Sequence, residues 1–171
     1  MYELLMLLWL IFKRLFYCFI ICLIWRSISM GCLNIYTMQY FLVKSEPFKY
    51  SWEKFNEDGR TFWDGVRNYQ ARNNIKLMKE GDLVLYYHSN EGKAVVGIAK
   101  VVKEFYQDPT TDDANWVVVD LVPVEALKNP VTLEQIKADE QLKDISLVRQ
   151  GRLSVMTLKA EEFDRIIEMG S

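Results

Sequence analysis

The chain has 171 residues, of which 50% are apolar and 26% are charged, which is the profile of a globular protein rather than a disordered one. Its length suits one domain with a core large enough to fold without disulfides. The formal net charge of −2 excludes the strongly basic surface of proteins that coat nucleic-acid backbones.

The first 37 residues differ from the rest because almost all of them are bulky and apolar. All three cysteines, Cys18, Cys22 and Cys32, lie in this segment. Residues 38–171 therefore hold no disulfide or thiolate metal site, and we expect a reducing compartment, the cytoplasm or a eukaryotic nucleus. Without the three basic and one acidic residues of the segment, 18 of the 21 basic and 22 of the 23 acidic residues remain.

Three interpretations of residues 1–37 stay open. The first interpretation is a membrane or targeting segment. Residues 4–25 are long enough to span a membrane, but inserting Lys13 and Arg14 at the centre of the span costs about 2.5 to 3.5 kcal/mol each. The same two charges would also interrupt the apolar region of a signal peptide. The second interpretation, which we favour, is a misassigned start with the domain beginning at Met38. The third is a helix that binds a partner. We expect the segment to contribute nothing to the fold, and membrane association only if it is translated and inserted.

In chain order, the hydrophobic pattern predicts strands at 39–43, 82–88, 94–102, 116–124 and 153–158, and helices at 52–58, 68–78, 133–138 and 160–169. Ser51 and Thr132 are typical residues for the start of a helix, and Gly59 is typical of its end. Long strands with short helices between them indicate an α+β fold with a curled, mostly antiparallel sheet. Residues 38–171 contain no GxGxxG or Walker-type loop, which disfavours a dinucleotide or NTPase site.

His88 is the only histidine, so it is the first residue to consider for catalysis. Asp64 or Asp82 could orient it, and Ser89 lies next to it, but no cysteine nucleophile exists in residues 38–171. One histidine cannot build a histidine-rich metal site. The sequence therefore favours a protein that is not an enzyme and that needs no metal or cofactor.

The run 62–73 is dense in aromatic and polar residues and leads into a predicted helix. Arg67 and Arg72 could meet phosphates, Trp63 or Tyr69 offers a ring for stacking, and Asn68 can both donate to and accept from a base edge. The alternative is that the rings belong to the core and the polar groups cap the helix. The run 147–155 places Arg149 and Arg152 around Gly151, which a solvated turn would also explain.

These segments resemble the EVE domain family, in the same order along the chain. The matching motifs are Lys44-Ser45-Glu46-Pro47, Ser51-Trp52, the run 62–73, Gly81-Asp82-Leu83-Val84, Tyr87-His88-Ser89, Val96-Gly97-Ile98-Ala99, Trp116, Val119-Asp120 and the run 149–155. The resemblance covers about residues 38–169. It implies a PUA-like fold, a twisted and mostly antiparallel β-barrel with short helices, similar in architecture to the YTH domains that hold a methylated adenine in an aromatic cage.

The resemblance further implies a binding module that takes a modified base of nucleic acid into a pocket, with a modified cytosine such as 5-methylcytosine in DNA as the expected ligand. RNA binding is the alternative, and an enzyme acting on nucleic acid is a less favoured one. Between Pro109 and Trp116 the chain has only a short acidic link where many family members carry a longer insertion. On the matching positions, the implied base-binding residues are Lys44, Ser45, Glu46, Trp63, Asn68, Tyr69, His88 and Ser89, and the phosphate-binding residues are Arg67, Arg72, Arg149 and Arg152.

Overall fold

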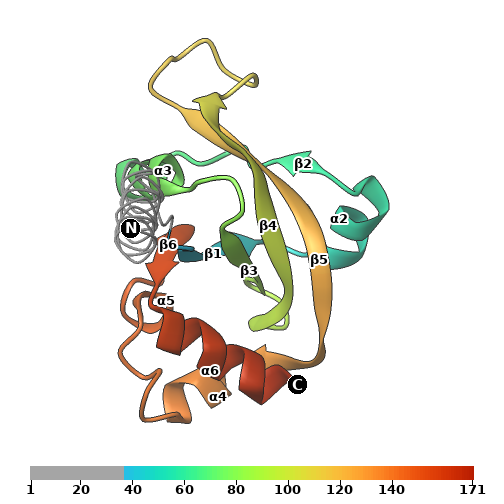
Figure 1. Cartoon of the computed structure of the whole chain (residues 1–171), viewed down its shortest axis with the longest axis vertical. Coiled ribbons are helices and arrows are strands. Elements are labelled where there is room, and N and C mark those ends of the chain that lie inside the picture. The colour runs from blue at the N-terminus through green and yellow to red at the C-terminus, as the bar shows by residue number, and fades with distance from the viewer. Residues whose placement is uncertain (1–36) are drawn as a thin grey trace, which may run out of the picture. The chain divides into compact units, whose positions relative to one another are not determined.

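A six-stranded sheet organises residues 37–171, the part of the chain that this computed structural model describes (Figure 1). Its strands are β1 (Tyr40–Ser45), β2 (Thr61–Phe62), β3 (Leu83–His88), β4 (Ala94–Gln107), β5 (Val117–Thr132) and β6 (Val155–Leu158). They lie in the order β2-β5-β4-β3-β1-β6, and every neighbouring pair is antiparallel except β1 with β3. The α+β class is confirmed, whereas closure of the sheet into a barrel stays a prediction.

Five short helices connect or cover the strands. They are α2 (Trp52–Asp58), α3 (Tyr69–Leu77), α4 (Leu133–Ala138), α5 (Ser146–Arg149) and α6 (Ala160–Gly170). The predicted caps are present: the Ser51 side chain accepts from the Lys54 N–H, and Thr132 forms a capping box with Gln135. Gly59 ends α2 with a φ of 68°, a left-handed conformation that glycine adopts without strain.

Residues 1–36 lie outside the described residues, and the expectations for the N-terminal segment stay predictions. Residues 38–171 form one compact unit. Within residues 37–171, no helix has both the length and the apolar character needed to cross a membrane.

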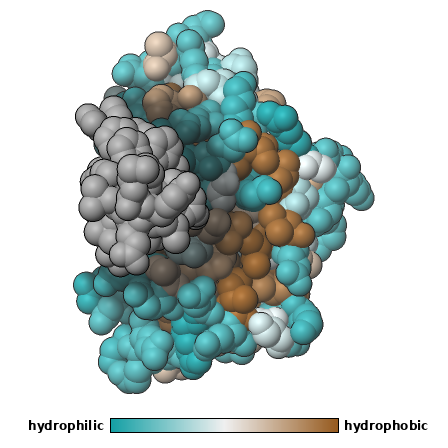
Figure 2. Space-filling view, in the orientation of Figure 1, coloured by the Kyte–Doolittle hydropathy of each residue, from teal (hydrophilic) through white to brown (hydrophobic). Residues whose placement is uncertain are grey.

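The hairpin of β4 and β5 is longer than the sequence predicts, since the two strands pair as far as Gln107 and Val117 (Figure 1). Beyond residue 102 most side chains of β4 are exposed, so the apolar alternation fades while the backbone pairing continues. Figure 2 shows a band of apolar side chains over the middle of this hairpin, surrounded by a hydrophilic surface. Exposed Val124 and partly buried Ile98 belong to these strands.

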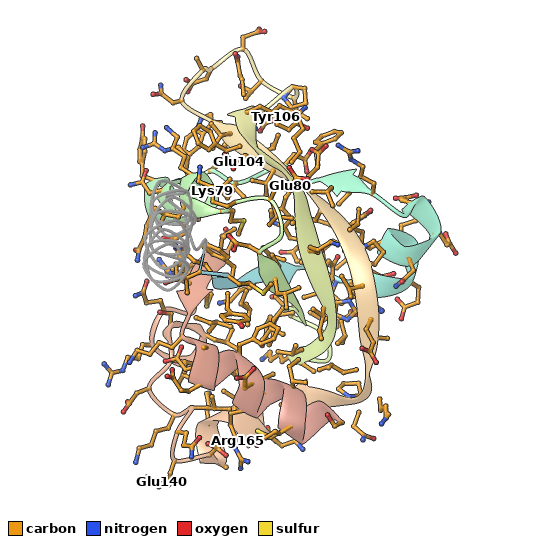
Figure 3. All side chains as sticks on the ribbon, viewed as in Figure 1. Lys79, Glu80, Glu104, Tyr106, Glu140 and Arg165 are labelled. Atoms are coloured by element: carbon orange, nitrogen blue, oxygen red, sulfur yellow. The ribbon has the colours of Figure 1, made fainter. Side chains whose placement is uncertain are left out.

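Polar contacts lie at both ends of the compact unit formed by residues 38–171 (Figure 3). At one end Lys79 pairs with Glu104 at 2.8 Å, and the Tyr106 hydroxyl donates to the buried Asp120 at 2.6 Å. At the other end Arg165 of α6 donates to Asp139 through two nitrogens, at 2.8 and 2.9 Å. Exposed pairs such as Lys79–Glu104 contribute little stability, whereas the two hydrogen bonds from Arg165 to one oxygen of Asp139 link α6 to the end of α4.

An aromatic core lies behind the ends of β1 and β3. Tyr86 is fully buried, and Trp52 and Phe55 of α2 pack on it with ring centroids 5.3 and 5.5 Å away. Gly97 of β4 makes room for Trp52, because a Cβ at this position would lie 2.4 to 2.6 Å from atoms of the indole ring. The small residue at position 97 therefore allows α2 to pack closely on the sheet.

Candidate functional site

The parallel strands β1 and β3 end side by side, with Ser45 opposite His88. The Ser45 carbonyl accepts from both the backbone N–H and the hydroxyl of Ser89, at 2.7 and 3.1 Å. Beyond Ser45 and His88 both strands end and the backbone continues into separate loops. Polar residues from distant parts of the sequence consequently gather at one edge of the sheet.

A cavity of about 680 Å³ opens at this edge. It is bounded by the end of β1, the loop into α2, strand β2 with the loop after it, the loop after β3, and the turn before β6. The lining residues are Lys44, Ser45, Glu46, Lys49, Tyr50, Thr61, Phe62, Trp63, Asp64, Gly65, Val66, Ser89, Asn90, Gly151, Arg152, Leu153 and Ser154. Its volume is in the range of pockets that take small ligands.

Trp63 forms a rigid wall of this cavity. Its backbone N–H donates to the Val119 carbonyl at 2.8 Å, which continues the pairing of β2 with β5. The indole is 8% exposed and meets the Tyr86 ring edge-on, at 5.6 Å between centroids and 84° between planes. Burial raises the pKa of Tyr86 to about 12, and its neutral hydroxyl donates to the Tyr50 carbonyl at 2.8 Å. The aromatic core thus holds both Trp63 and the Tyr50 loop in place.

Charged groups of both signs line the cavity. Lys44 donates to the Gly151 carbonyl at 3.0 Å, which ties β1 to the turn before β6, and burial lowers the pKa of its amine. Glu46 pairs with Lys49 at 2.6 Å, and Asp64 lies on the same lining. Arg152 has no ion-pair partner within residues 37–171. A wall with donors and acceptors suits a ligand that presents both, as the edge of a nucleobase does.

The structure brings part of the predicted set together in this cavity. Its lining includes the following predicted residues: Lys44, Ser45, Glu46, Trp63, Ser89 and Arg152. Sequence reasoning missed Lys49, Tyr50, Phe62, Asp64 and Asn90. Each of these residues lies within four positions of a predicted lining residue. They could have been found by including the loop positions next to each motif in the predicted site.

His88 and Asn68 are not on the cavity lining, and both make hydrogen bonds to backbone groups. His88 Nε2 accepts from the Trp52 N–H at 3.1 Å, at the start of α2. Burial lowers the pKa of His88, and the negative charge of Glu53 partly offsets this. The Asn68 side chain accepts from the Ala71 N–H at 3.0 Å and so caps α3. Their roles in base binding stay predictions.

The carboxylates considered as partners of His88 have other positions. Asp82 precedes β3, at the opposite end from His88, and accepts from the backbone N–H groups of Gln39 and Lys79 at 2.8 Å. Asp64 lies on the cavity lining. Within residues 37–171 no group of His, Cys, Asp and Glu side chains is arranged to hold a metal ion.

Four predicted residues lie on other surfaces. Arg149 pairs with Asp144 at 2.7 Å, and both side chains are largely exposed. The other three predicted residues lie together with Trp116. We call the set of Arg67, Tyr69, Arg72 and Trp116 the Tyr69 cluster. Trp116 contacts the Tyr69 ring at 5.3 Å between centroids. Contact of these residues with nucleic acid stays a prediction.

Fold and cavity define the class of the protein as a small α+β binding domain with an aromatic wall and a polar lining. The EVE domain model matches residues 39–169. The chain therefore belongs to the EVE domain family, which confirms the resemblance described above.

Similar proteins and solved structures support this assignment. The chain is 37% identical over 164 residues to thymocyte nuclear protein 1 of Mus musculus, covering 76% of this chain and 73% of that protein. The crystal structure of protein Atu2648 from Agrobacterium tumefaciens matches with a TM-score of 0.77 and 46% identity, covering 78% of this chain and 93% of that one. Human THYN1, solved in complex with DNA containing 5-methylcytosine, matches with a TM-score of 0.72 and 32% identity, covering 78% and 98%.

Proposed function

We propose that this protein is a reader of modified bases, which takes one base of a nucleic acid into the cavity beside Trp63. The observation that carries the proposal is the cavity itself, which Trp63, held in place by Tyr86, lines together with hydrogen-bonding groups of both kinds. The complex of human THYN1 with DNA containing 5-methylcytosine supports DNA and a modified cytosine as the ligand. The proposal includes the PUA-like barrel that the family resemblance implies, and a cytoplasmic or nuclear site of action.

The lining offers a partner for each edge group of cytosine. The exocyclic amine of the base is a donor, and the carboxylates of Glu46 and Asp64 are acceptors. The ring nitrogen and the carbonyl of the base are acceptors, which the Asn90 amide and the remaining N–H groups of the Lys44 amine can meet. A methyl group at C5 would lie against apolar parts of the wall such as Phe62 or Leu153.

The energies set how selective such a reader can be. Removing a base from a duplex costs a few kcal/mol, and stacking on an aromatic side chain returns about 1–3 kcal/mol per base. Burying one methyl group adds roughly 0.8 kcal/mol. We therefore expect a preference for the methylated base of a few-fold to about tenfold, and stronger binding where the base is already unpaired.

Replacement of Trp63 tests this assignment. In Trp63→Ala, affinity for every oligonucleotide should fall by about 1–3 kcal/mol, because stacking is indifferent to base identity. Trp63→Phe should retain part of the affinity. Trp52→Phe is the matched control, since Trp52 is as buried and packs on the same Tyr86 ring but does not line the cavity. Fluorescence anisotropy with DNA and RNA oligonucleotides containing cytosine or 5-methylcytosine would measure these affinities.

Two results would overturn the proposal. A folded Trp63→Ala protein that binds the best oligonucleotide as tightly as the parent would place the base elsewhere. A chemical change in the oligonucleotide, detected by mass spectrometry and lost in His88→Ala, would show an enzyme instead of a reader. Stronger binding to RNA than to DNA would leave the reader proposal standing and change its substrate.

A further inference from the structure

The four residues of the Tyr69 cluster form a ladder in which two neighbouring rings lie between two guanidinium groups. The Arg67 guanidinium lies 5.5 Å from the Trp116 ring, and the Trp116 ring lies 5.3 Å from the Tyr69 ring at an interplanar angle of 34°. The Arg72 guanidinium lies 4.9 Å from the Tyr69 ring on α3. Each distance is within the range in which a cation or a second ring attracts an aromatic face.

This ladder is a surface feature. Tyr69 is 63% exposed and Trp116 is partly exposed, whereas tryptophan side chains in proteins are highly buried on average and tyrosine side chains are intermediate. Neither ring belongs to the hydrophobic core of residues 37–171. The core therefore does not explain why two aromatic side chains are held together here.

Two carboxylates, Asp108 and Asp113, already interact with Arg67, so Arg72 is the cation of the ladder that can meet an anionic partner. Arg67 pairs with buried Asp108 at 2.9 Å, which fixes the position of its guanidinium. Arg72 reaches only neutral oxygens, those of the Asn73 side chain and the Asn115 carbonyl, and no carboxylate within residues 37–171 pairs with it. An arginine stacked on a ring keeps its N–H groups free along the edge, where they can bond a phosphate.

The ladder also begins next to the rim of the cavity. Val66 lines the cavity, Arg67 follows it directly, and Tyr69 lies three residues after Val66. Three residues span at most roughly 10 Å. A strand with one base in the cavity can therefore reach the ladder with a neighbouring nucleotide.

We propose that the Tyr69 cluster binds a second, unpaired nucleobase of the strand whose modified base enters the cavity. The base stacks on Tyr69, and the Arg72 guanidinium bonds the adjacent phosphate. A nucleotide is the occupant that fits, because it offers an aromatic face and a negative charge together, as the ladder does. This inference rests on the proposed function and adds the flanking nucleotide to it.

The test removes the two sides of this contact separately. The full chain, with Tyr69 or Ala at position 69, is titrated with single-stranded DNA containing one 5-methylcytosine. A second set of strands carries abasic sites at the nucleotides on both sides of that base. We expect Tyr69→Ala to weaken binding of the intact strand roughly tenfold and to leave binding of the abasic strand unchanged. Tyr69→Phe, which keeps the ring, should bind like the parent.

Phe105→Ala is the matched control, because Phe105 is an exposed ring with a lysine, Lys76, 5.9 Å away but without a second ring beside it in residues 37–171. It should bind both strands as the parent does. Two results would overturn the inference: Tyr69→Ala weakens binding of the intact and the abasic strands equally, or it weakens neither. The second result would indicate that the ladder binds a protein partner instead of a nucleotide. Trp63→Ala distinguishes the two proposals, since loss of binding there with no effect of Tyr69→Ala would retain the cavity and reject the cluster. A chain that binds neither strand would reject both.

Discussion

Trp63 and Tyr69 are six positions apart in one segment, yet their surroundings differ in almost every respect. Trp63 is 8% exposed and held edge-on by a buried ring, while Tyr69 is 63% exposed and contacts Trp116 and Arg72. Around Trp63 the hydrogen-bonding groups come from four separate segments of the chain, 44–50, 61–66, 89–90 and 151–154. Around Tyr69 they are mainly two arginines.

The difference separates two kinds of recognition. A walled cavity with fixed donors and acceptors can discriminate between bases, because a mismatched group is left without a partner. An open ring flanked by guanidinium groups accepts any base and any phosphate, so it adds affinity without choice. Selectivity should therefore depend on the packing behind the cavity, and general affinity on surface charge.

The largest expected effect comes from disturbing that packing. In Gly97→Ala the new methyl group would collide with the Trp52 ring, and we expect a loss of about 1–3 kcal/mol in the free energy of unfolding. Preference for the modified base should fall as well, because Tyr86 contacts both Trp52 and Trp63. Urea unfolding measures the first effect. Gly151→Ala is the control, since a Cβ there meets no atom of the described residues within 4 Å, and equal stability of the two variants would contradict the prediction.

A smaller effect should follow the protonation of His88. Burial lowers the pKa of His88 in the folded protein, so its contribution to stability is present above about pH 6.5, the ordinary histidine pKa, and is lost as the pH falls through the lowered value. A protonated Nε2 cannot accept from the Trp52 N–H. In His88→Gln the amide oxygen accepts at any pH, so the parent should lose stability relative to this variant between pH 7.5 and 5. Thermal unfolding at both pH values measures this, and parallel losses in the two proteins would refute it.

The smallest expected effect distinguishes the two arginines of the turn before β6. Arg152 lines the cavity without an ion-pair partner in the described part of the chain, whereas Arg149 is paired with Asp144. Arg152→Ala should therefore reduce the slope of log affinity against log salt by about 1, with equal losses for modified and unmodified strands. Arg149→Ala should change the slope less. Titrations between 50 and 200 mM salt would show it, and identical slopes would remove the distinction.

Much of the fold could be predicted from the sequence because the signals are local. Ser51, Gly59 and Thr132 cap helices through contacts with residues only a few positions away. By contrast, β2 was not predicted, because two residues form a strand here only through pairing with Leu121 and Asp120 of β5. The ends of β4 and β5 were missed for the same reason, since partner strands rather than side-chain patterns extend them.

The candidate site was predictable to the extent that motifs lie at strand ends. Lys44 and Ser45 end β1, so a sequence motif there also marks the edge of the sheet. Polarity alone did not separate Asn68 from Ser89, because the first satisfies the backbone of its own helix and the second lines the cavity. Such a distinction depends on side-chain direction, which the tertiary structure decides.

The parallel pairing of β1 with β3 has a consequence for folding order. Tyr40 pairs with Leu83 on one side and with Leu158 on the other, so β1 can pair with its neighbours only after long loops have closed. By contrast, β3, β4 and β5 follow one another along the chain and pair through shorter connections. We expect the hairpins to form early and β1 to insert late between β3 and β6. Because the cavity needs the ends of both β1 and β3, it exists only in the completed fold. A bound base should consequently slow unfolding and raise the melting temperature in proportion to the logarithm of its concentration.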